Sequence, residues 1–178
     1  DLIYTVPSNW MLERAKASSI LKGSNIHLLR NPIDTEVFKK YSIDEVNTLR
    51  DELNIDEESF VIVFGAIAGK KNKLKGIDLL NRAFELLQSK LLESPFSKVV
   101  LVDFGGIKAE GKLFGFRNIS LGHIKDSIYL AKLYCTADCV VVPSMVEAFG
   151  QVAAEALSCC TPVISFNTSG LRDIVLDK

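Results

Sequence analysis

The sequence predicts an α/β fold with a doubly wound parallel sheet, and three of its features support that prediction. Residues 60–66 form a continuous apolar run of the kind found in strands that are buried on both faces. Short apolar strands alternate with longer helical segments along residues 35–178, which is the pattern of right-handed βαβ units. The chain has 178 residues, of which 48% are hydrophobic, so it can also bury one good core.

The N-terminal part should form a strand, a helix and a second strand that lead into a linker. These elements are expected at residues 1–6, 10–21, 26–29 and 30–34. Pro7 stops the first strand, Ser8 or Asn9 suits the N-cap of the helix, and Gly23 ends the helix. Pro32 and its polar neighbours make the linker a turn region.

The remainder of the chain should alternate between helices and strands. The helices are expected at residues 43–53, 76–92, 127–135 and 149–159 and from residue 171 onward, and the strands at residues 60–66, 99–104, 118–121, 139–143 and 161–166. Residues 35–41 are ambiguous, and residues 167–170 should form a turn. Residues 105–116 are expected to be irregular and start with Gly105 and Gly106, which permit either a close approach to a ligand or a tight turn.

Composition argues against several classes of protein. The formal net charge of -1 leaves no basic footprint for nucleic acid, so we expect no nucleic-acid partner. No apolar run approaches the roughly 18 residues of a membrane span, and the first residues show no signal segment.

The four cysteines have no C-x-x-C spacing and lie mostly in or beside apolar stretches; they are Cys135, Cys139, Cys159 and Cys160. They are expected to be reduced, buried, structural thiols of a cytoplasmic protein.

The segment after the strand at residues 139–143 predicts an anion site. A helix that begins near Phe149 and Gly150 would direct its free amides and the positive end of its dipole beyond the strand, which favours a bound phosphate. Glu147 and Glu155 would flank that site.

Four lysines crowd the loop that follows residues 60–66, namely Lys70, Lys71, Lys73 and Lys75. Such a cluster is most often a solvated surface. However, a loop at the carboxyl end of a central parallel strand opens toward the crevice where doubly wound sheets bind ligands. The loop lacks the lysine-serine/threonine ending of a P-loop, so it does not indicate a nucleoside-triphosphate hydrolase. His123 is a lone loop histidine and is assigned no general-base role.

These segments resemble, in the same order, the motifs of retaining GT-B glycosyltransferases of family 4. Pro143-Ser144-x-x-Glu147-Ala148-Phe149-Gly150 with Glu155-Ala156 and Thr161-Pro162-Val163 is similar to the E-x7-E region of that family. The other matching segments are Phe64-Gly65-Ala66, Lys75-Gly76-Ile77-Asp78, Leu121-Gly122-His123-Ile124, Tyr134-x-x-Ala137-Asp138, Asn31-Pro32-Ile33-Asp34 and Pro7-Ser8-Asn9-Trp10. The resemblance implies that residues 1–34 are the end of an N-terminal domain plus the interdomain linker. Residues 35–178 would be a Rossmann-like nucleotide-sugar-binding domain, truncated before its last helices.

The resemblance also implies a role for each candidate residue. Glu147 would contact the donor sugar or the charge at its anomeric centre, and Lys75 would neutralise the leaving diphosphate. Glu155 would accept hydrogen bonds from the ribose hydroxyls. Further donor contacts are implied for Phe149, Gly150, Gln151, Val152, Gly65, Ala66, Lys70, Lys71, His123, Ile124 and Ser144. The arginine usual in the family about six positions before the lysine is absent, so leaving-group stabilisation would rest on lysines.

The function implied by the resemblance is that of a retaining hexosyltransferase in polysaccharide biosynthesis. The full-length protein would transfer a sugar from a nucleotide-diphosphate sugar to a glycan or lipid-linked acceptor, without a metal or other cofactor. The acceptor would bind through the other domain, so this chain alone is expected to be inactive. The protein would be cytoplasmic, with peripheral membrane association as an option. Two alternatives stay open, a sugar-nucleotide epimerase or other GT-B nucleotide-binding domain, and a non-catalytic nucleotide-binding or interaction module.

Overall fold

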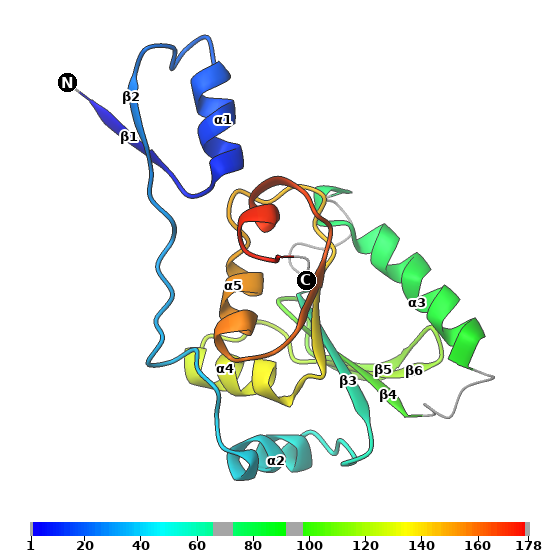
Figure 1. Cartoon of the computed structure of the whole chain (residues 1–178). Coiled ribbons are helices and arrows are strands. Elements are labelled where there is room, and N and C mark those ends of the chain that lie inside the picture. The colour runs from blue at the N-terminus through cyan, green and yellow to red at the C-terminus, as the bar shows by residue number, and fades with distance from the viewer. Residues whose placement is uncertain (1, 66–72, 92–97, 177–178) are drawn as a thin grey trace.

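The chain folds into a small N-terminal unit and a larger α/β body, joined by an extended segment (Figure 1). The structure is a computed structural model that describes residues 2–65, 73–91 and 98–176. Within these ranges, no helix is both long enough and apolar enough to cross a bilayer.

The N-terminal unit contains strand β1 (Ile3–Val6), helix α1 (Asn9–Ala17) and strand β2 (Asn25–Leu28), and the two strands pair in parallel. Ser8 caps the helix as expected, because its hydroxyl accepts a hydrogen bond from the Met11 amide at 3.2 Å. The helix ends at Ala17, one turn before the predicted residue 21. The Ser18 hydroxyl accepts a hydrogen bond from the Ile20 amide at 3.3 Å, and this local bond competes with the helix.

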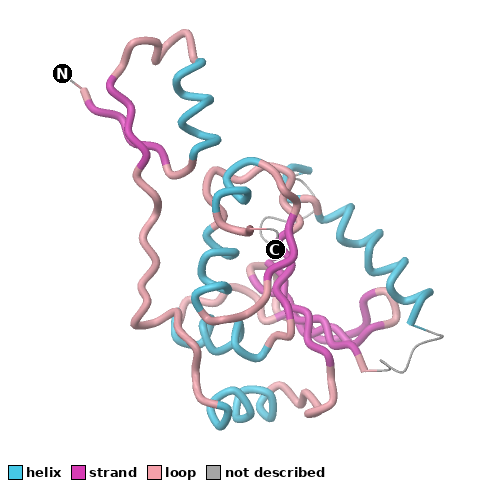
Figure 2. The backbone as a smooth tube through the Cα atoms, viewed as in Figure 1, coloured by secondary structure: helices cyan, strands magenta, loops and turns pink. Residues whose placement is uncertain are grey.

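The body contains a six-stranded sheet in the order β5-β6-β4-β3-β7-β8 (Figures 1 and 2). The strands are β3 (Phe60–Gly65), β4 (Val99–Phe104), β5 (Ala109–Leu113), β6 (Phe116–Ser120), β7 (Cys139–Val142) and β8 (Val163–Ser165). All neighbours pair in parallel except β5, which is antiparallel to β6. The predicted α/β class with a parallel sheet is confirmed.

Helices cover both faces of this sheet (Figure 2). Helices α2 (Ile43–Glu52), α4 (Ser127–Thr136) and α5 (Gln151–Ser158) contribute to the core on one face, and α3 (Ile77–Leu91) to the core on the other. Along β3, Val61 and Val63 belong to the first core, whereas Ile62 and Phe64 belong to the second. This alternation explains why the β3 segment is continuously apolar.

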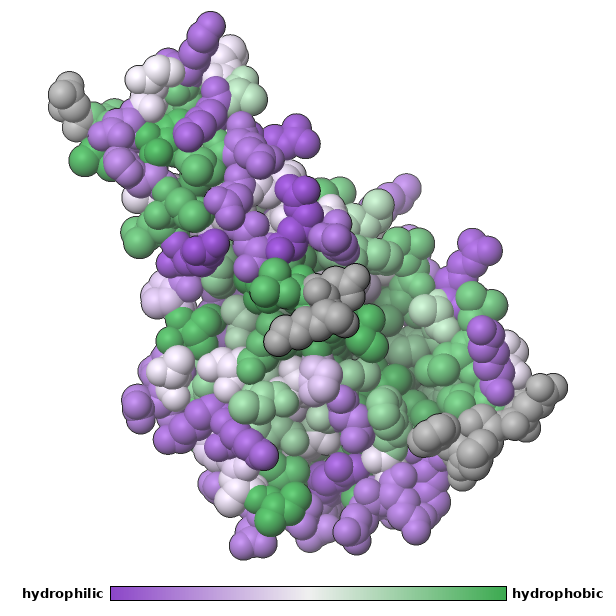
Figure 3. Space-filling model, in the orientation of Figure 1, coloured by the Kyte–Doolittle hydropathy of each residue, from purple (hydrophilic) through white to green (hydrophobic). Residues whose placement is uncertain are grey.

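The α3 face keeps an apolar cavity of about 490 Å³ between α3 and strands β3, β7 and β8. Leu87 on α3 and Ile164 on β8 are among its lining residues. Figure 3 shows apolar surface beside α3 in this part of the body. The second core is therefore less completely enclosed than the first.

The expectation of an irregular segment at residues 105–116 holds for residues 105–108 and is wrong for residues 109–116. Residues 109–113 form β5, which pairs with β6 through a two-residue turn at Phe114 and Gly115. Both turn residues have positive φ, 50° and 83°, which suits the right-handed twist of a tight hairpin. Strand β5 was not predicted because its Ala-Glu-Gly-Lys-Leu sequence has low β-propensity. Its side chains are also mostly exposed at the edge of the sheet.

The end of the chain also differs from the prediction of a helix from residue 171. The structure has a 3-10 helix, η3 (Ser169–Asp173), which begins inside the predicted turn. Ser169 is buried, has a left-handed φ of 47° and binds another loop through its hydroxyl. A long-range contact therefore sets this conformation instead of local helix propensity.

All four cysteines are free, as predicted. Cys139 and Cys159 are buried, Cys135 is partly exposed and Cys160 is exposed. The expectation that these thiols are buried is therefore wrong for Cys160, which follows the end of α5 with a left-handed φ of 62°.

Candidate functional site

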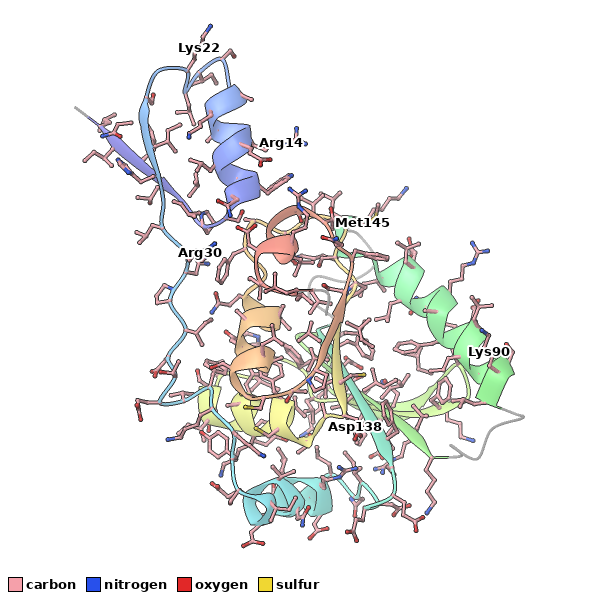
Figure 4. All side chains as sticks on the ribbon, in the orientation of Figure 1. Arg14, Lys22, Arg30, Lys90, Asp138 and Met145 are labelled. Atoms are coloured by element: carbon pink, nitrogen blue, oxygen red, sulfur yellow. The ribbon has the colours of Figure 1, made fainter. Side chains whose placement is uncertain are left out.

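The candidate site lies at the carboxyl ends of β3 and β7, the neighbouring strands at which the winding of the sheet reverses. The chain runs from β3 through α3 to β4 on one side, and from β7 through α5 to β8 on the other. Open α/β sheets bind ligands at such a switch point. A cavity of about 150 Å³ lies here, lined by Gly65, Lys75, Val141, Val142, Pro143, Ser144, Glu147, Gly150, Gln151 and Val152. Figure 4 labels Asp138 and Met145 at opposite ends of β7, and Met145 marks the carboxyl edge.

Lys75 and Glu147 form an ion pair in the cavity wall. The Lys75 Nζ lies 2.5 Å from the Glu147 Oε1, which also accepts a hydrogen bond from the Ser144 hydroxyl at 2.8 Å. The side chains are 30% and 20% exposed, so water reaches the pair and weakens it relative to a fully buried one. A phosphate group could therefore take the place of the carboxylate beside the lysine ammonium.

Gly76 explains how Lys75 comes so close to the β7 loop. Gly76 has a φ of 67°, and a Cβ atom there would lie 1.9 Å from the carbonyl oxygen of Pro143. Next to it, the Met145 amide donates to the Leu74 carbonyl at 2.8 Å. Only glycine allows the two loops to touch at this point, so the Lys-Gly pair is needed to place the ammonium group.

The loop that carries Glu147 is held by the C-terminal segment. The Glu147 amide donates to the Ser169 hydroxyl at 2.8 Å, and the Gly170 amide donates to the Glu147 carbonyl at 2.9 Å. The Thr168 hydroxyl donates to the Met145 carbonyl at 3.2 Å. These contacts fix the backbone of Glu147, and sequence reasoning missed them because residues 167–170 show only the composition of a turn.

The N-terminus of α5 forms another wall of the cavity. Its N-cap is Gly150, with a φ of 106° and no side chain to accept the first amides of the helix. These amides have no acceptor within the helix, and Gln151 and Val152 line the cavity. The helix begins at Gln151 and not at the predicted Phe149, whose side chain is buried and does not line the cavity. The arrangement can bind an anion.

Glu155 lies one turn further along α5. Its Oε2 accepts a hydrogen bond from the Tyr134 hydroxyl at 3.0 Å, and its Oε1 accepts one from the Gln151 side chain at 3.1 Å. Burial raises the pKa of Glu155 above its ordinary value, and burial likewise raises the pKa of Tyr134. Because Gln151 also lines the cavity, Glu155 is adjacent to the site without forming its wall.

The remaining predicted residues fall into two groups. His123 is exposed and Ile124 packs against the core, just after β6 at the same carboxyl edge, but neither lines the cavity. Ala66, Lys70 and Lys71 lie outside the described residues. In the part of the chain that the structure describes, no group of three or more His, Cys, Asp or Glu side chains could hold a metal ion.

The structure adds cavity residues that sequence reasoning did not propose. Val141, Val142 and Pro143 line the cavity at the end of β7. Val141 and Val142 were predicted only as strand residues and Pro143 only as the strand end and the start of a motif, and their apolar character could not distinguish a cavity wall from the core. Tyr134 was part of a recognised motif, but its contact with Glu155 depends on the packing of α4 against α5.

The chain is similar to known glycosyltransferases. A family model described as "Glycosyl transferases group 1" matches residues 45–178. The chain is 34% identical over 168 residues to a D-inositol 3-phosphate glycosyltransferase of Xylanimonas cellulosilytica, a match that covers 85% of the chain and 37% of that relative. It is 32% identical to an uncharacterized glycosyltransferase of Methanocaldococcus jannaschii, with 82% and 36% covered. The chain thus spans less than half the length of these curated relatives.

Solved structures show the same fold. Sucrose-phosphate synthase from Thermosynechococcus elongatus is 25% identical, with a TM-score of 0.73, and the match covers 96% of this chain and 42% of that one. HepE from Anabaena, in complex with UDP-glucose, is 18% identical with a TM-score of 0.65, and the match covers 99% and 56% of the two chains.

Proposed function

The chain belongs to the glycosyl transferases group 1 family, and we propose that it is the donor-binding part of a retaining hexosyltransferase of the family 4 type. The single observation that supports this most strongly is the Lys75–Glu147 pair beside the open N-terminus of α5 at the switch point of the sheet. A cation, helix amides and a carboxylate meet there in one cavity.

The parts of the site match the parts of a nucleotide-diphosphate sugar. Lys75 and the amides of Gln151 and Val152 would bind the diphosphate, because both present positive charge to the same cavity. Glu147, at the other side of the ion pair, would contact the sugar. Glu155 would accept hydrogen bonds from the ribose hydroxyls.

The same groups account for the chemistry. The bond between the anomeric carbon and the diphosphate oxygen breaks, and a bond from that carbon to an acceptor hydroxyl oxygen forms. The acceptor's proton passes to the departing diphosphate, on which negative charge has collected. Lys75 and the helix amides stabilise that charge in place, without having to reorganise during the reaction. Glu147 faces the positive charge that develops at the anomeric carbon. We propose that no metal takes part, because these fixed groups already supply positive charge at the leaving group.

The acceptor would bind between this body and a domain to which residues 1–34 contribute strands β1 and β2, helix α1 and the linker. The N-terminal unit already touches the body near the site, since the Asn9 amide donates to the Asp173 carboxylate at 2.7 Å. We propose a glycan or lipid-linked acceptor and a cytoplasmic location with peripheral membrane contact. This chain alone would then bind nucleotide without transferring sugar.

The test is a transfer assay on the intact protein with a panel of nucleotide-diphosphate sugars, followed by NMR of the product. We expect transfer with the donor's anomeric configuration retained. Lys75→Ala should lower the rate by about a hundredfold or more, the effect of losing one oxyanion-type stabiliser. Lys73→Ala is the matched control, because Lys73 lies two residues away and does not line the cavity. Equal rates for both variants would contradict the assignment, and an inverted product would contradict retention.

Glu147→Ala should lower the transfer rate while leaving the affinity for the free nucleoside diphosphate nearly unchanged. Epimerisation of a nucleotide sugar by the intact protein would favour the epimerase alternative. Nucleotide binding without any transfer or epimerisation would favour a non-catalytic module.

A further inference from the structure

The hydroxyl of Tyr134 is buried behind the candidate ribose-binding carboxylate. We propose that Tyr134 is a positioning residue, which orients Glu155 so that both carboxylate oxygens can accept the two neighbouring hydroxyls of a ribose. The proposal rests on the proposed function and deepens it, because recognition of a ribonucleotide would depend on a hydroxyl that does not touch the ligand.

The contact between the two residues joins separate helices. The Tyr134 hydroxyl on α4 donates to the Glu155 Oε2 on α5 at 3.0 Å, although the residues are 21 positions apart in the sequence. Tyr134 is 0% exposed, whereas Glu155 is only partly buried. The tyrosine therefore approaches the carboxylate from the core, and the exposed part of the carboxylate remains available to a ligand.

Tyr134 is a rigid support for that hydrogen bond. Its ring packs against Phe38 and Phe104, with ring centroids 6.3 Å and 6.0 Å away. Its carbonyl accepts a hydrogen bond from the Thr161 hydroxyl at 2.8 Å. Close packing of the ring and anchoring of the backbone leave the hydroxyl little freedom, so the hydroxyl fixes the plane of the Glu155 carboxylate.

The hydrogen-bond capacity of the carboxylate fits two further donors. Oε2 accepts from Tyr134 and Oε1 accepts from the exposed Gln151 side chain at 3.1 Å. Each oxygen of an ionised carboxylate has two lone-pair sites, so each can still accept one hydroxyl. Burial raises the pKa of Glu155, and the hydrogen bond from Tyr134 acts in the opposite direction by favouring the ionised acceptor. Tyr134 thus supports both the position and the charge that the ribose needs.

The test compares Tyr134→Phe with wild type by calorimetric titration of the intact protein. The probe is whichever of UDP, GDP and ADP binds wild type most tightly, together with its 2′,3′-dideoxy analogue. Tyr134→Phe removes one oxygen atom and should weaken binding of the ribonucleotide about tenfold, as expected for a hydrogen bond to a charged group. The analogue, which has no ribose hydroxyls, should bind wild type and variant equally.

Two further variants separate positioning from general damage to the fold. Tyr41→Phe is the matched control, because it removes a hydroxyl that donates only to the Val37 carbonyl at 3.1 Å, and it should leave both affinities unchanged. In the background of Glu155→Ala, Tyr134→Phe should cause no additional loss, because it acts through that carboxylate. An additional tenfold loss in this background, or equal losses with the ribonucleotide and its analogue, would overturn the proposal.

The outcome also distinguishes this proposal from the function on which it rests. If Glu155→Ala weakens ribonucleotide binding and Tyr134→Phe does not, only the role of Tyr134 falls. If wild type binds none of the three nucleotides, or Glu155→Ala has no effect, the donor-site assignment and the role of Tyr134 fall together.

A second measurement needs no variant of Tyr134. With tyrosine labelled at Cζ with carbon-13, the Tyr134 resonance of wild type should shift when the ribonucleotide binds and shift much less with the dideoxy analogue. Equal shifts with both ligands, or none with the ribonucleotide, would contradict the proposal.

Discussion

Replacing Gly76 with alanine should displace Lys75 relative to the loop after β7, and the structure gives the least size of that displacement. A Cβ atom at residue 76 would lie 1.9 Å from the Pro143 carbonyl oxygen, and real Cβ atoms essentially never come within 3.0 Å of a neighbour. The two loops must therefore separate by at least 3.0 − 1.9 = 1.1 Å. The φ of 67° adds a strain of roughly 1–2 kcal/mol for an alanine.

The expected consequence is a loss of both stability and rate. A catalytic group misplaced by about 1 Å can cost a hundredfold in rate, so we expect sugar transfer by Gly76→Ala to be about a hundredfold slower. Clash and backbone strain together should lower the free energy of unfolding by more than about 2 kcal/mol.

Substitutions at two other glycines separate the effect of the steric clash from the effect of the backbone strain. Gly23 has a φ of 81° with nothing within 4 Å of its added Cβ, and Gly111 likewise has open space and no positive φ. In urea unfolding and initial-rate assays of the intact protein, Gly111→Ala should match wild type and Gly23→Ala should show only the backbone strain. A wild-type transfer rate for a folded Gly76→Ala would refute the reasoning.

Three more predictions follow from the site and the core. Ser169→Ala should lower kcat for transfer about tenfold, with little change in nucleotide affinity, because it removes one of the hydrogen bonds that fix the backbone of Glu147 and leaves the diphosphate contacts in place. A loss of affinity alone would contradict this. Nucleotide affinity should decline as the pH falls through the raised pKa of Glu155, starting above the ordinary value of 4.5, and calorimetry on Glu155→Gln should show this part of the pH dependence removed. The free energy of unfolding should change with pH in the opposite direction to the nucleotide affinity. Burial favours the neutral form of Glu155, so the wild-type fold gains stability relative to Glu155→Gln as the pH falls. Phe84→Ala should lower the free energy of unfolding by about 3–5 kcal/mol in urea, because Phe84 is 3% exposed and packs against Phe64; a loss below about 1 kcal/mol would contradict its place in the core.

The sequence predicts the parallel sheet well because each buried strand is a run of apolar residues that can be recognised locally. The continuous apolar run at β3 reflects cores on both faces, and the apolar run at β7 ends where the cavity begins. Glu147 and Lys75 could be proposed for one site because the loops after parallel strands meet at one edge of a sheet.

Other features of the site depend on contacts between distant residues, and local patterns do not record these. Gly76 lies close to Pro143, but the sequence shows only a glycine that follows a lysine and does not indicate this contact. The hydrogen bond that the Glu147 amide donates to the Ser169 hydroxyl involves a serine with a left-handed backbone, which propensity disfavours. The Tyr134 contact arises only when α4 packs beside α5.

The central claim is that the cavity between β3 and β7 binds the diphosphate of the sugar donor. The most direct measurement is a crystal structure of the intact protein with a bound nucleoside diphosphate. We expect the phosphate oxygens within hydrogen-bond distance of the Lys75 Nζ and of the amides of Gln151 or Val152, with the Lys75–Glu147 pair separated. A nucleotide bound elsewhere, with that ion pair intact, would contradict the account.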